Sequence, residues 1–116
     1  MKQDSSGPSV RSVRWTGNTA VVEVVGDIDL HRSPGFQEAL LAVLDQKPER
    51  VVVNLGQVSY MDSSGVASLV KLLSRARRLG VPVFLVGLGR RVRSIFEITH
   101  LDSVSDICET EQEALS

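Results

Sequence analysis

The fold of this chain is decided by a stretch near its middle, VVVNLGQVSYMDSSGV, which occupies residues 51–66. Its first five residues are apolar except for Asn54, as in a strand that is buried on both faces. Further on, Asp62-Ser63-Ser64-Gly65 places small polar residues and a glycine where a loop passes into a helix. The stretch therefore predicts a buried strand, a loop over residues 56–62 and the start of a helix.

The helix that follows this loop is amphipathic. Apolar residues share one face at helical spacing, namely Val66, Leu69, Val70, Leu73 and Ala76. Polar residues share the opposite face, namely Ser68, Lys71, Arg75 and Arg78. Gly80 then matches the left-handed glycine that commonly ends a helix. We expect the apolar face to be buried and the polar face to be exposed.

The segments before this stretch predict a β-hairpin and then a helix. Strand-like residues 10–15 and 20–25 flank Gly17-Asn18, a pair with turn character. Ser33-Pro34 has the pattern of an N-cap followed by proline at the first helical position. Apolar residues then recur at helical spacing, so we expect this helix to run to about Gln46.

The segments after the stretch predict shorter elements. The pattern predicts a buried strand over residues 83–86 and a short helix over residues 92–96. It also predicts a last short strand over residues 104–108 and a capping box at residues 110–113 that opens a terminal turn. Apolar strands thus alternate with amphipathic helices after the opening hairpin. This order predicts an α/β fold with a mixed, mainly parallel sheet of four to five strands and helices packed on it.

Length and composition indicate a single soluble globular domain. The chain has 116 residues, of which 42% are hydrophobic and 23% are charged, as is ordinary for such a domain. We expect residues 1–8, which contain Ser, Gly and Pro, to be a flexible segment, and residues 9–116 to form the domain. The formal net charge of −1 offers no whole-molecule attraction to nucleic acid or to an anionic membrane.

Several classes of protein are disfavoured by what the sequence lacks. No stretch approaches the roughly 20 apolar residues that span a bilayer, and the start lacks the apolar run of a signal peptide, so we expect a cytoplasmic protein. Cys108 is the single cysteine and no Cys/His cluster occurs, which argues against a disulfide and a metal site. We see no constellation of nucleophile and base, and therefore expect no catalytic residue and no cofactor.

The segment Asp62-Ser63-Ser64-Gly65 has a chemical implication of its own. The free amides of a first helical turn point outward, and the helix dipole adds about half a positive charge. A phosphate added to a serine at this position would be well accommodated. The simpler interpretation of these four residues alone is that Asp62 or Ser63 only caps the helix.

Two stretches resemble the STAS domains of anti-sigma-factor antagonists. One is residues 51–65, and the other is Gly26-Asp27-Ile28-Asp29-Leu30, which is similar to the Gly-Glu-Leu-Asp pattern that these proteins carry after their second strand. The order of elements matches the family from about Ser9 to Ala114. The resemblance implies a STAS-type single domain that acts as an anti-sigma-factor antagonist in a partner-switching module.

The resemblance also implies how such a switch works. In the family, the second serine of Asp-Ser-Ser-Gly is phosphorylated by the anti-sigma factor, which is a serine kinase, and the matching residue here is Ser64. A PP2C-type phosphatase reverses the modification. The unphosphorylated form binds the anti-sigma factor and frees the sigma factor, and phosphate weakens this complex. We therefore expect a kinase and phosphatase substrate rather than an enzyme, without direct nucleic-acid contact, as a monomer or weak dimer.

The resemblance places four further residues at the partner-binding site, namely Asp29, Asp62, Ser63 and Gly65. Asp62 is expected to cap the helix and accept local hydrogen bonds, and Ser63 to help set up the helix start. Gly65 is expected to let a partner approach closely. Asp29 is expected to contact the Ser64 hydroxyl or the kinase.

The chain departs from the family pattern in one loop, and two other functions fit the same fold. Asp27 replaces the common Glu, and His31-Arg32 stand where a Thr or another small residue is common, so we expect this loop to have its own partner specificity. A STAS scaffold subunit of a stress-sensing or membrane-transport complex would never need modification at Ser64. An anion- or nucleotide-binding STAS domain would instead use the helix end at residues 62–65 as its ligand site.

Overall fold

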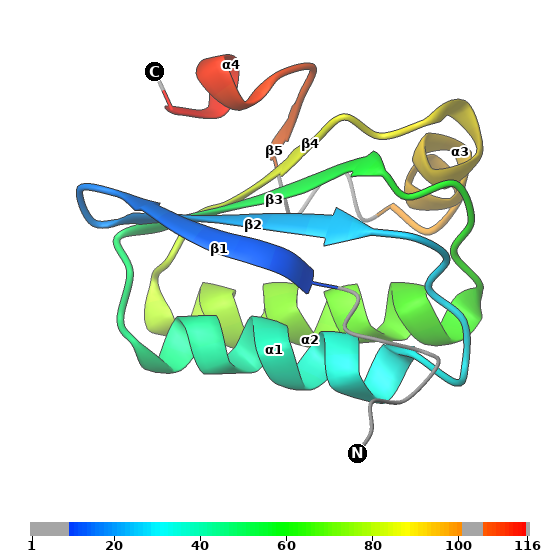
Figure 1. The fold of residues 1–116 in the computed structure, drawn as a ribbon, viewed down its shortest axis with the longest axis horizontal. Coiled ribbons are helices and arrows are strands. Elements are labelled where there is room, and N and C mark those ends of the chain that lie inside the picture. Colours follow the sequence, from blue (N-terminus) through cyan, green and yellow to red (C-terminus); the bar gives the residue numbers. More distant parts are fainter. Residues whose placement is uncertain (1–9, 101–105, 116) are drawn as a thin grey trace.

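The computed structural model describes residues 10–100 and 106–115, and a five-stranded sheet lies at its centre (Figure 1). The strands, in sequence order across the sheet, are β1 (Val10–Thr16), β2 (Thr19–Val25), β3 (Arg50–Gln57), β4 (Val83–Val86) and β5 (Asp106–Cys108). β1 pairs with β2 antiparallel, whereas the other three pairs are parallel. The predicted mixed, mainly parallel sheet is confirmed. The expected flexible segment, residues 1–8, lies outside the described residues, as do the first two residues of the expected last strand.

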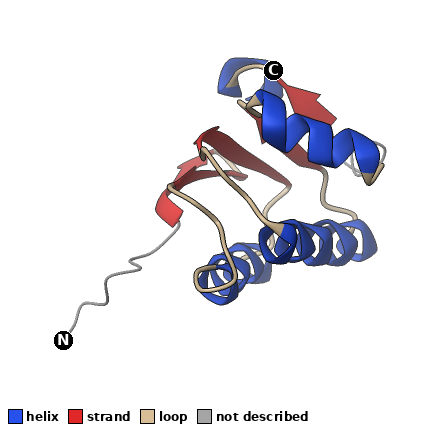
Figure 2. Cartoon of the chain, turned by 90° about the vertical axis from the view of Figure 1, so that its right-hand side faces the viewer, coloured by secondary structure: helices blue, strands red, loops and turns tan. Residues whose placement is uncertain are grey.

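The helices cover the two faces of the sheet unequally. α1 (Ser33–Asp45) and α2 (Ser63–Leu79) lie side by side along one face, as Figures 1 and 2 both show. The short α4 (Glu111–Leu115) lies over the opposite face, and α3 (Arg90–Ile98) packs at the end of the sheet where α2 begins (Figure 1). The predicted order of strands and helices is thus confirmed.

The central strands are buried on both faces because their side chains alternate between two apolar clusters. Val51 and Val53 join the larger cluster between the sheet and helices α1 and α2, whereas Val52 joins the smaller cluster under α4. This two-sided burial explains the continuous apolar run in β3. Asn54 is the polar residue in this run, and its side-chain amide is satisfied by hydrogen bonds. It accepts a bond from the Gly56 amide and donates one to Glu111.

The buried face of α2 differs from the predicted one at two residues. Val70 is 42% exposed, although it was expected in the core, and Ser68 is buried, although it was expected on the solvent face. The reason is that α2 packs against α1 as well as against the sheet, which turns Ser68 towards the other helix. The Ser68 hydroxyl is satisfied there, because it donates to the backbone oxygens of Ser33 and Ser64.

The start of α1 also differs from the prediction, in which Ser33 was the N-cap. Arg32 occupies the cap position without a side-chain cap bond, and Ser33 is buried in the first turn. The amides of Arg32 and Ser33 are instead bound by the backbone oxygen of Asp29, at 3.1 and 2.8 Å. The preceding loop therefore supplies the cap that the sequence pattern assigned to Ser33.

Candidate functional site

Two loops that are distant in sequence are joined at one end of the sheet. The loop after β2 and the loop after β3 continue the parallel pairing of their strands through an isolated bridge between Ile28 and Met61. The Ile28 amide donates to the Tyr60 oxygen at 2.9 Å, and the Asp62 amide donates to the Ile28 oxygen at 3.1 Å. This pairing places the segment around Asp29 beside the start of α2.

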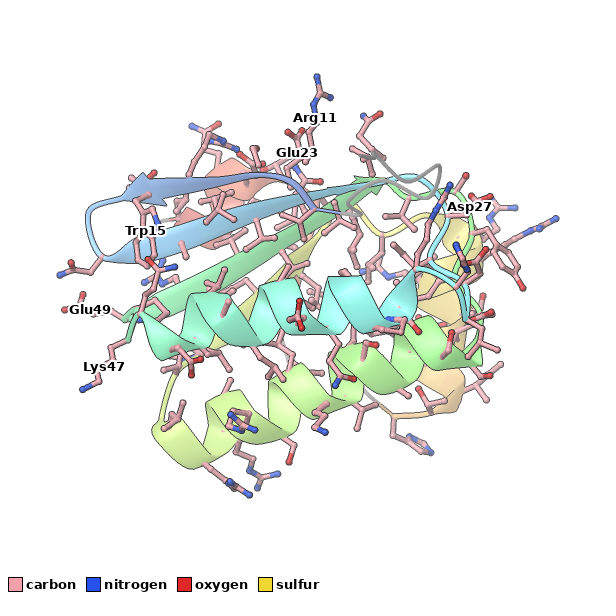
Figure 3. The ribbon with its side chains drawn as sticks, turned by 60° about the horizontal axis from the view of Figure 1, so that its bottom comes forward. Arg11, Trp15, Glu23, Asp27, Lys47 and Glu49 are labelled. Carbon is pink, nitrogen blue, oxygen red and sulfur yellow. The ribbon has the colours of Figure 1, made fainter. Side chains whose placement is uncertain are left out.

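A side-chain contact strengthens the same junction. The Ser59 hydroxyl donates to Asp27 Oδ1 at 2.9 Å, which links the two loops at their solvent-exposed edge. Figure 3 shows Asp27 at the end of the molecule opposite Lys47 and Glu49. All the residues that the sequence predicts for the switch therefore lie at this one end, where the parallel strands finish.

Asp62 is the N-cap of α2, as predicted. Its backbone is extended, and its Oδ1 accepts hydrogen bonds from the Ser64 amide at 2.9 Å and the Gly65 amide at 3.3 Å. The Ser64 hydroxyl donates to the same oxygen at 2.5 Å. The bond from this hydroxyl, together with those from the backbone amides, holds the pKa of Asp62 below its usual value. The carboxylate is therefore ionised and fully engaged at neutral pH.

The two serines of the motif have different surroundings. Ser63 is exposed on the first turn of α2, whereas Ser64 is half-buried and its hydroxyl is directed at Asp62. The amide of Ser64 belongs to the same first turn, so the hydroxyl lies in the positive field of the helix start. Ser64 thus combines partial exposure with a fixed orientation, and Ser63 provides a natural control position beside it.

Gly65 has a packing role that the sequence pattern does not reveal. The residue is buried, and a Cβ atom placed on it would lie 2.7 Å from Ile28 Cγ2 and 2.7 Å from Met61 Cγ. Ile28 and Met61 are the two residues of the bridge between the loops. Residues of this chain, rather than of a partner, therefore approach Gly65 closely. The absence of a side chain at Gly65 lets α2 begin directly against the joined loops.

Asp29 shapes the loop before α1. Its Oδ1 accepts bonds from the amides of His31 and Arg32, at 3.1 and 3.0 Å. In the described part of the chain the Ser64 hydroxyl donates to Asp62 and not to Asp29. The expected contact between Asp29 and the Ser64 hydroxyl is thus replaced by a local turn, while the carboxylate of Asp29 remains close to the site.

An exposed leucine at this site was missed by the sequence reasoning. Leu30 is 75% exposed and, with Asp29, His31 and Asp62, it lines an open hollow beside the start of α2. The Leu30 amide donates to Asp62 Oδ2 at 3.1 Å. A signal was available, because an apolar residue between Asp29 and His31 in a polar loop is a candidate for contact with another molecule.

Among the residues that the structure describes, no group of three or more His, Cys, Asp or Glu side chains is arranged to hold a metal ion. None of the described helices combines the length and the apolar character that crossing a membrane requires.

Comparisons with known proteins agree with this architecture. The chain is 32% identical over 88 residues to the anti-sigma-B factor antagonist of Staphylococcus epidermidis, a match that covers 76% of this chain and 82% of that protein. The crystal structure of an anti-sigma factor antagonist from Mycobacterium paratuberculosis superposes with a TM-score of 0.78 at 27% identity, covering 90% of this chain and 88% of the other.

A third comparison concerns the fold alone. The anti-sigma factor antagonist SpoIIAA in its unphosphorylated form has a TM-score of 0.71 at 20% identity, with 90% of this chain and 93% of that one covered. The model of the STAS domain family matches residues 11–114, which include both long helices and all five strands except Val10, the first residue of β1. This chain therefore belongs to the STAS domain family.

Proposed function

We propose that this chain is an anti-sigma-factor antagonist that is switched off by phosphorylation of Ser64. The observation that carries the proposal is the position of the Ser64 hydroxyl, which is half-buried, oriented by Asp62 and located in the first turn of α2. The names of the relatives, which are anti-sigma factor antagonists, support the same function. In this proposal the unphosphorylated chain binds a serine-kinase anti-sigma factor and thereby frees the sigma factor.

The reaction transfers the γ-phosphoryl group of ATP to Ser64 Oγ, with ADP as the leaving group and loss of the hydroxyl proton. Asp62 accepts the hydrogen bond of this hydroxyl, which presents the oxygen in one orientation. The pKa of Asp62 is lowered, so its carboxylate is a weak base, and we assign removal of the proton to the kinase. The chain itself is then a substrate, and a PP2C-type phosphatase restores the hydroxyl.

A phosphate at Ser64 would change the surface more than the fold. It adds about −1.5 to −2 charges and three acceptor oxygens at a helix start, where the helix dipole favours an anion. The same charge stands next to the carboxylate of Asp62, which also binds the amide of the exposed Leu30. A partner that fits closely over this surface would meet new charge and bulk, which weakens the complex.

The first test is direct phosphorylation. The chain is incubated with ATP and the kinase-type anti-sigma factor of its own organism, and the modified residue is mapped by mass spectrometry. We expect one phosphate, on Ser64, and expect Ser63→Ala to be modified normally while Ser64→Ala is not modified. Absence of phosphate from Ser64 together with absence of a complex would refute the proposal and would favour a scaffold or ligand-binding STAS domain.

The second test measures affinity by calorimetry with the same anti-sigma factor. We expect Ser64→Ala to bind nearly as well as the unmodified chain and Ser64→Asp to bind at least about tenfold more weakly, because the added charge lies inside the contact surface. Ser74→Asp places the same charge on an exposed residue of α2 outside the predicted site and is the matched control, for which we expect unchanged affinity. Equal affinities for Ser64→Ala and Ser64→Asp would contradict a switch at Ser64.

A further inference from the structure

We infer that Asp62 is a positioning residue that couples the chemical state of Ser64 to the backbone of the exposed loop at Leu30. This inference rests on the proposed function for its biological meaning, because it explains how modification of Ser64 reaches a second part of the partner-binding surface. It adds an internal change in the chain to the direct effect of the phosphate charge.

The two oxygens of the Asp62 carboxylate serve different parts of the chain. Oδ1 accepts three hydrogen bonds from the first turn of α2, from the Ser64 amide, the Ser64 hydroxyl and the Gly65 amide. Oδ2 accepts one bond, from the Leu30 amide in the loop before α1. One rigid group thus joins the helix that carries Ser64 to a loop 32 residues earlier in the sequence.

The Leu30 amide is the group of this loop that donates a hydrogen bond to the Asp62 carboxylate. On one side of it, the Ile28 amide is bound by the Tyr60 oxygen, a backbone contact that does not involve Asp62. On the other side, the amides of His31 and Arg32 are bound by Asp29 within the loop itself. A change at Asp62 is therefore expected to act first on Leu30 and to leave the flanking backbone bonds in place.

Phosphorylation of Ser64 alters every interaction of the carboxylate. The hydroxyl donor is lost, the phosphate oxygens compete for the amides of Ser64 and Gly65, and two anionic groups are brought together. The carboxylate must turn away or move, and the bond from its Oδ2 to the Leu30 amide is released. The backbone that carries the Leu30 side chain, which is 75% exposed at the edge of the hollow, then loses this restraint.

The consequence concerns partner recognition. An exposed leucine held in one position can fill an apolar recess of a partner at low entropic cost, whereas the same leucine on a released loop must be ordered on binding. Acidic groups flank the leucine in the hollow, Asp29 and Asp62, so the matching surface of the anti-sigma factor would combine an apolar recess with cationic groups. Release of the loop would weaken the apolar part of this fit, and displacement of the Asp62 carboxylate would change where the negative charge stands against the partner's cationic groups.

The test uses the isolated 116-residue chain with phosphoserine incorporated at position 64 during synthesis, so that no kinase is needed. Solvent exchange of individual amides is measured by NMR in the unmodified and phosphoserine forms. We expect the Leu30 amide to exchange at least about threefold faster in the phosphoserine form, as expected on loss of a hydrogen bond to a charged group. The Ile28 amide, bound to backbone, should be unchanged and is the internal control.

A variant separates coupling through Asp62 from a general loosening of the loop. Asp62→Ser retains a residue that caps helices well but removes the second oxygen that binds the Leu30 amide. In this variant we expect fast Leu30 exchange in both forms and no further change on modification. An unchanged Leu30 exchange rate in the phosphoserine form of the unmutated chain would overturn the inference, as would a full response in Asp62→Ser.

The result is independent of the proposed function because no partner is present. If the Leu30 amide responds but the chain binds no anti-sigma factor, the coupling is supported and the proposed function fails. If the phosphoserine form loses affinity while Leu30 does not respond, the switch holds and the coupling through Asp62 is refuted.

Discussion

Replacing Gly65 by alanine should destabilise the chain, whereas the same replacement of Gly35 should not. Each glycine is the third residue of a long helix, α2 and α1 respectively, so the helical preference for alanine favours both variants by up to about 1 kcal/mol. A Cβ at Gly35 meets nothing within 4 Å, but a Cβ at Gly65 would lie 2.7 Å from side-chain atoms of both Ile28 and Met61. The backbone oxygen of Ile28, at 3.1 Å, closes the third side.

The two variants should differ in their free energy of unfolding by about 1–3 kcal/mol, the usual cost of forcing an extra methyl into a packed site. Urea unfolding followed by far-ultraviolet circular dichroism measures this difference, provided that both transitions are two-state with similar slopes. Gly35→Ala should be as stable as the unmutated chain or slightly more stable. Equal stability of Gly35→Ala and Gly65→Ala would refute the close packing between α2 and the joined loops.

Three further predictions concern the core and α4. Leu69→Ala should lower the free energy of unfolding by about 2–5 kcal/mol, because Leu69 is fully buried. Val70→Ala should lower it by less than about 0.5 kcal/mol, because Val70 is 42% exposed. Equal losses of stability in urea unfolding would contradict the observed buried face of α2. Glu111→Gln weakens the bond from Arg14 that holds α4 against the sheet, so α4 should expose the partly buried Cys108 beneath it more often. Cys108 should then react faster with a thiol reagent at pH 8. An unchanged reaction rate would argue against the anchoring of α4 by Glu111. Hydrogen bonds from Arg14 and Asn54 lower the pKa of Glu111. The ionised Glu111 therefore stabilises the fold at pH values above 4.5, the ordinary pKa of this group, and this stabilisation is lost as the pH falls below that value. NMR signals of α4 should lose their dispersion in that pH range before the signals of the sheet, and simultaneous loss would contradict the prediction.

Local patterns were sufficient for most of the secondary structure. The apolar run of β3 and the helical spacing after Gly65 depend only on neighbouring side chains, and both elements form at these residues, although β3 continues to Gln57, two residues into the predicted loop. The cap at Asp62 was also predictable, because an N-cap bonds to amides only two and three residues ahead of it. Gly80, with φ of 73°, ends α2 for an equally local reason.

Positions in contact with a second element were less predictable. Ser68 and Val70 exchange their expected environments because α1 covers one flank of α2, and no periodicity within α2 can reveal that neighbour. The exchange of Ser68 and Val70 arises because this tertiary contact outweighs the local preference. Ser33 differs, because a local bond from its amide to the backbone oxygen of Asp29, four residues earlier, places it inside the first turn of α1.

The switch segment shows the same division most clearly. The residues Asp62 to Gly65 and the phosphorylatable Ser64 could be selected from the linear sequence, because a helix start with hydroxyl groups is a local feature. The bond from Leu30 to Asp62 and the packing of Ile28 against Gly65 could not, because they join segments about 35 residues apart. Only the parallel alignment of β2 with β3 brings those segments together, since it carries both loops to the same end of the sheet.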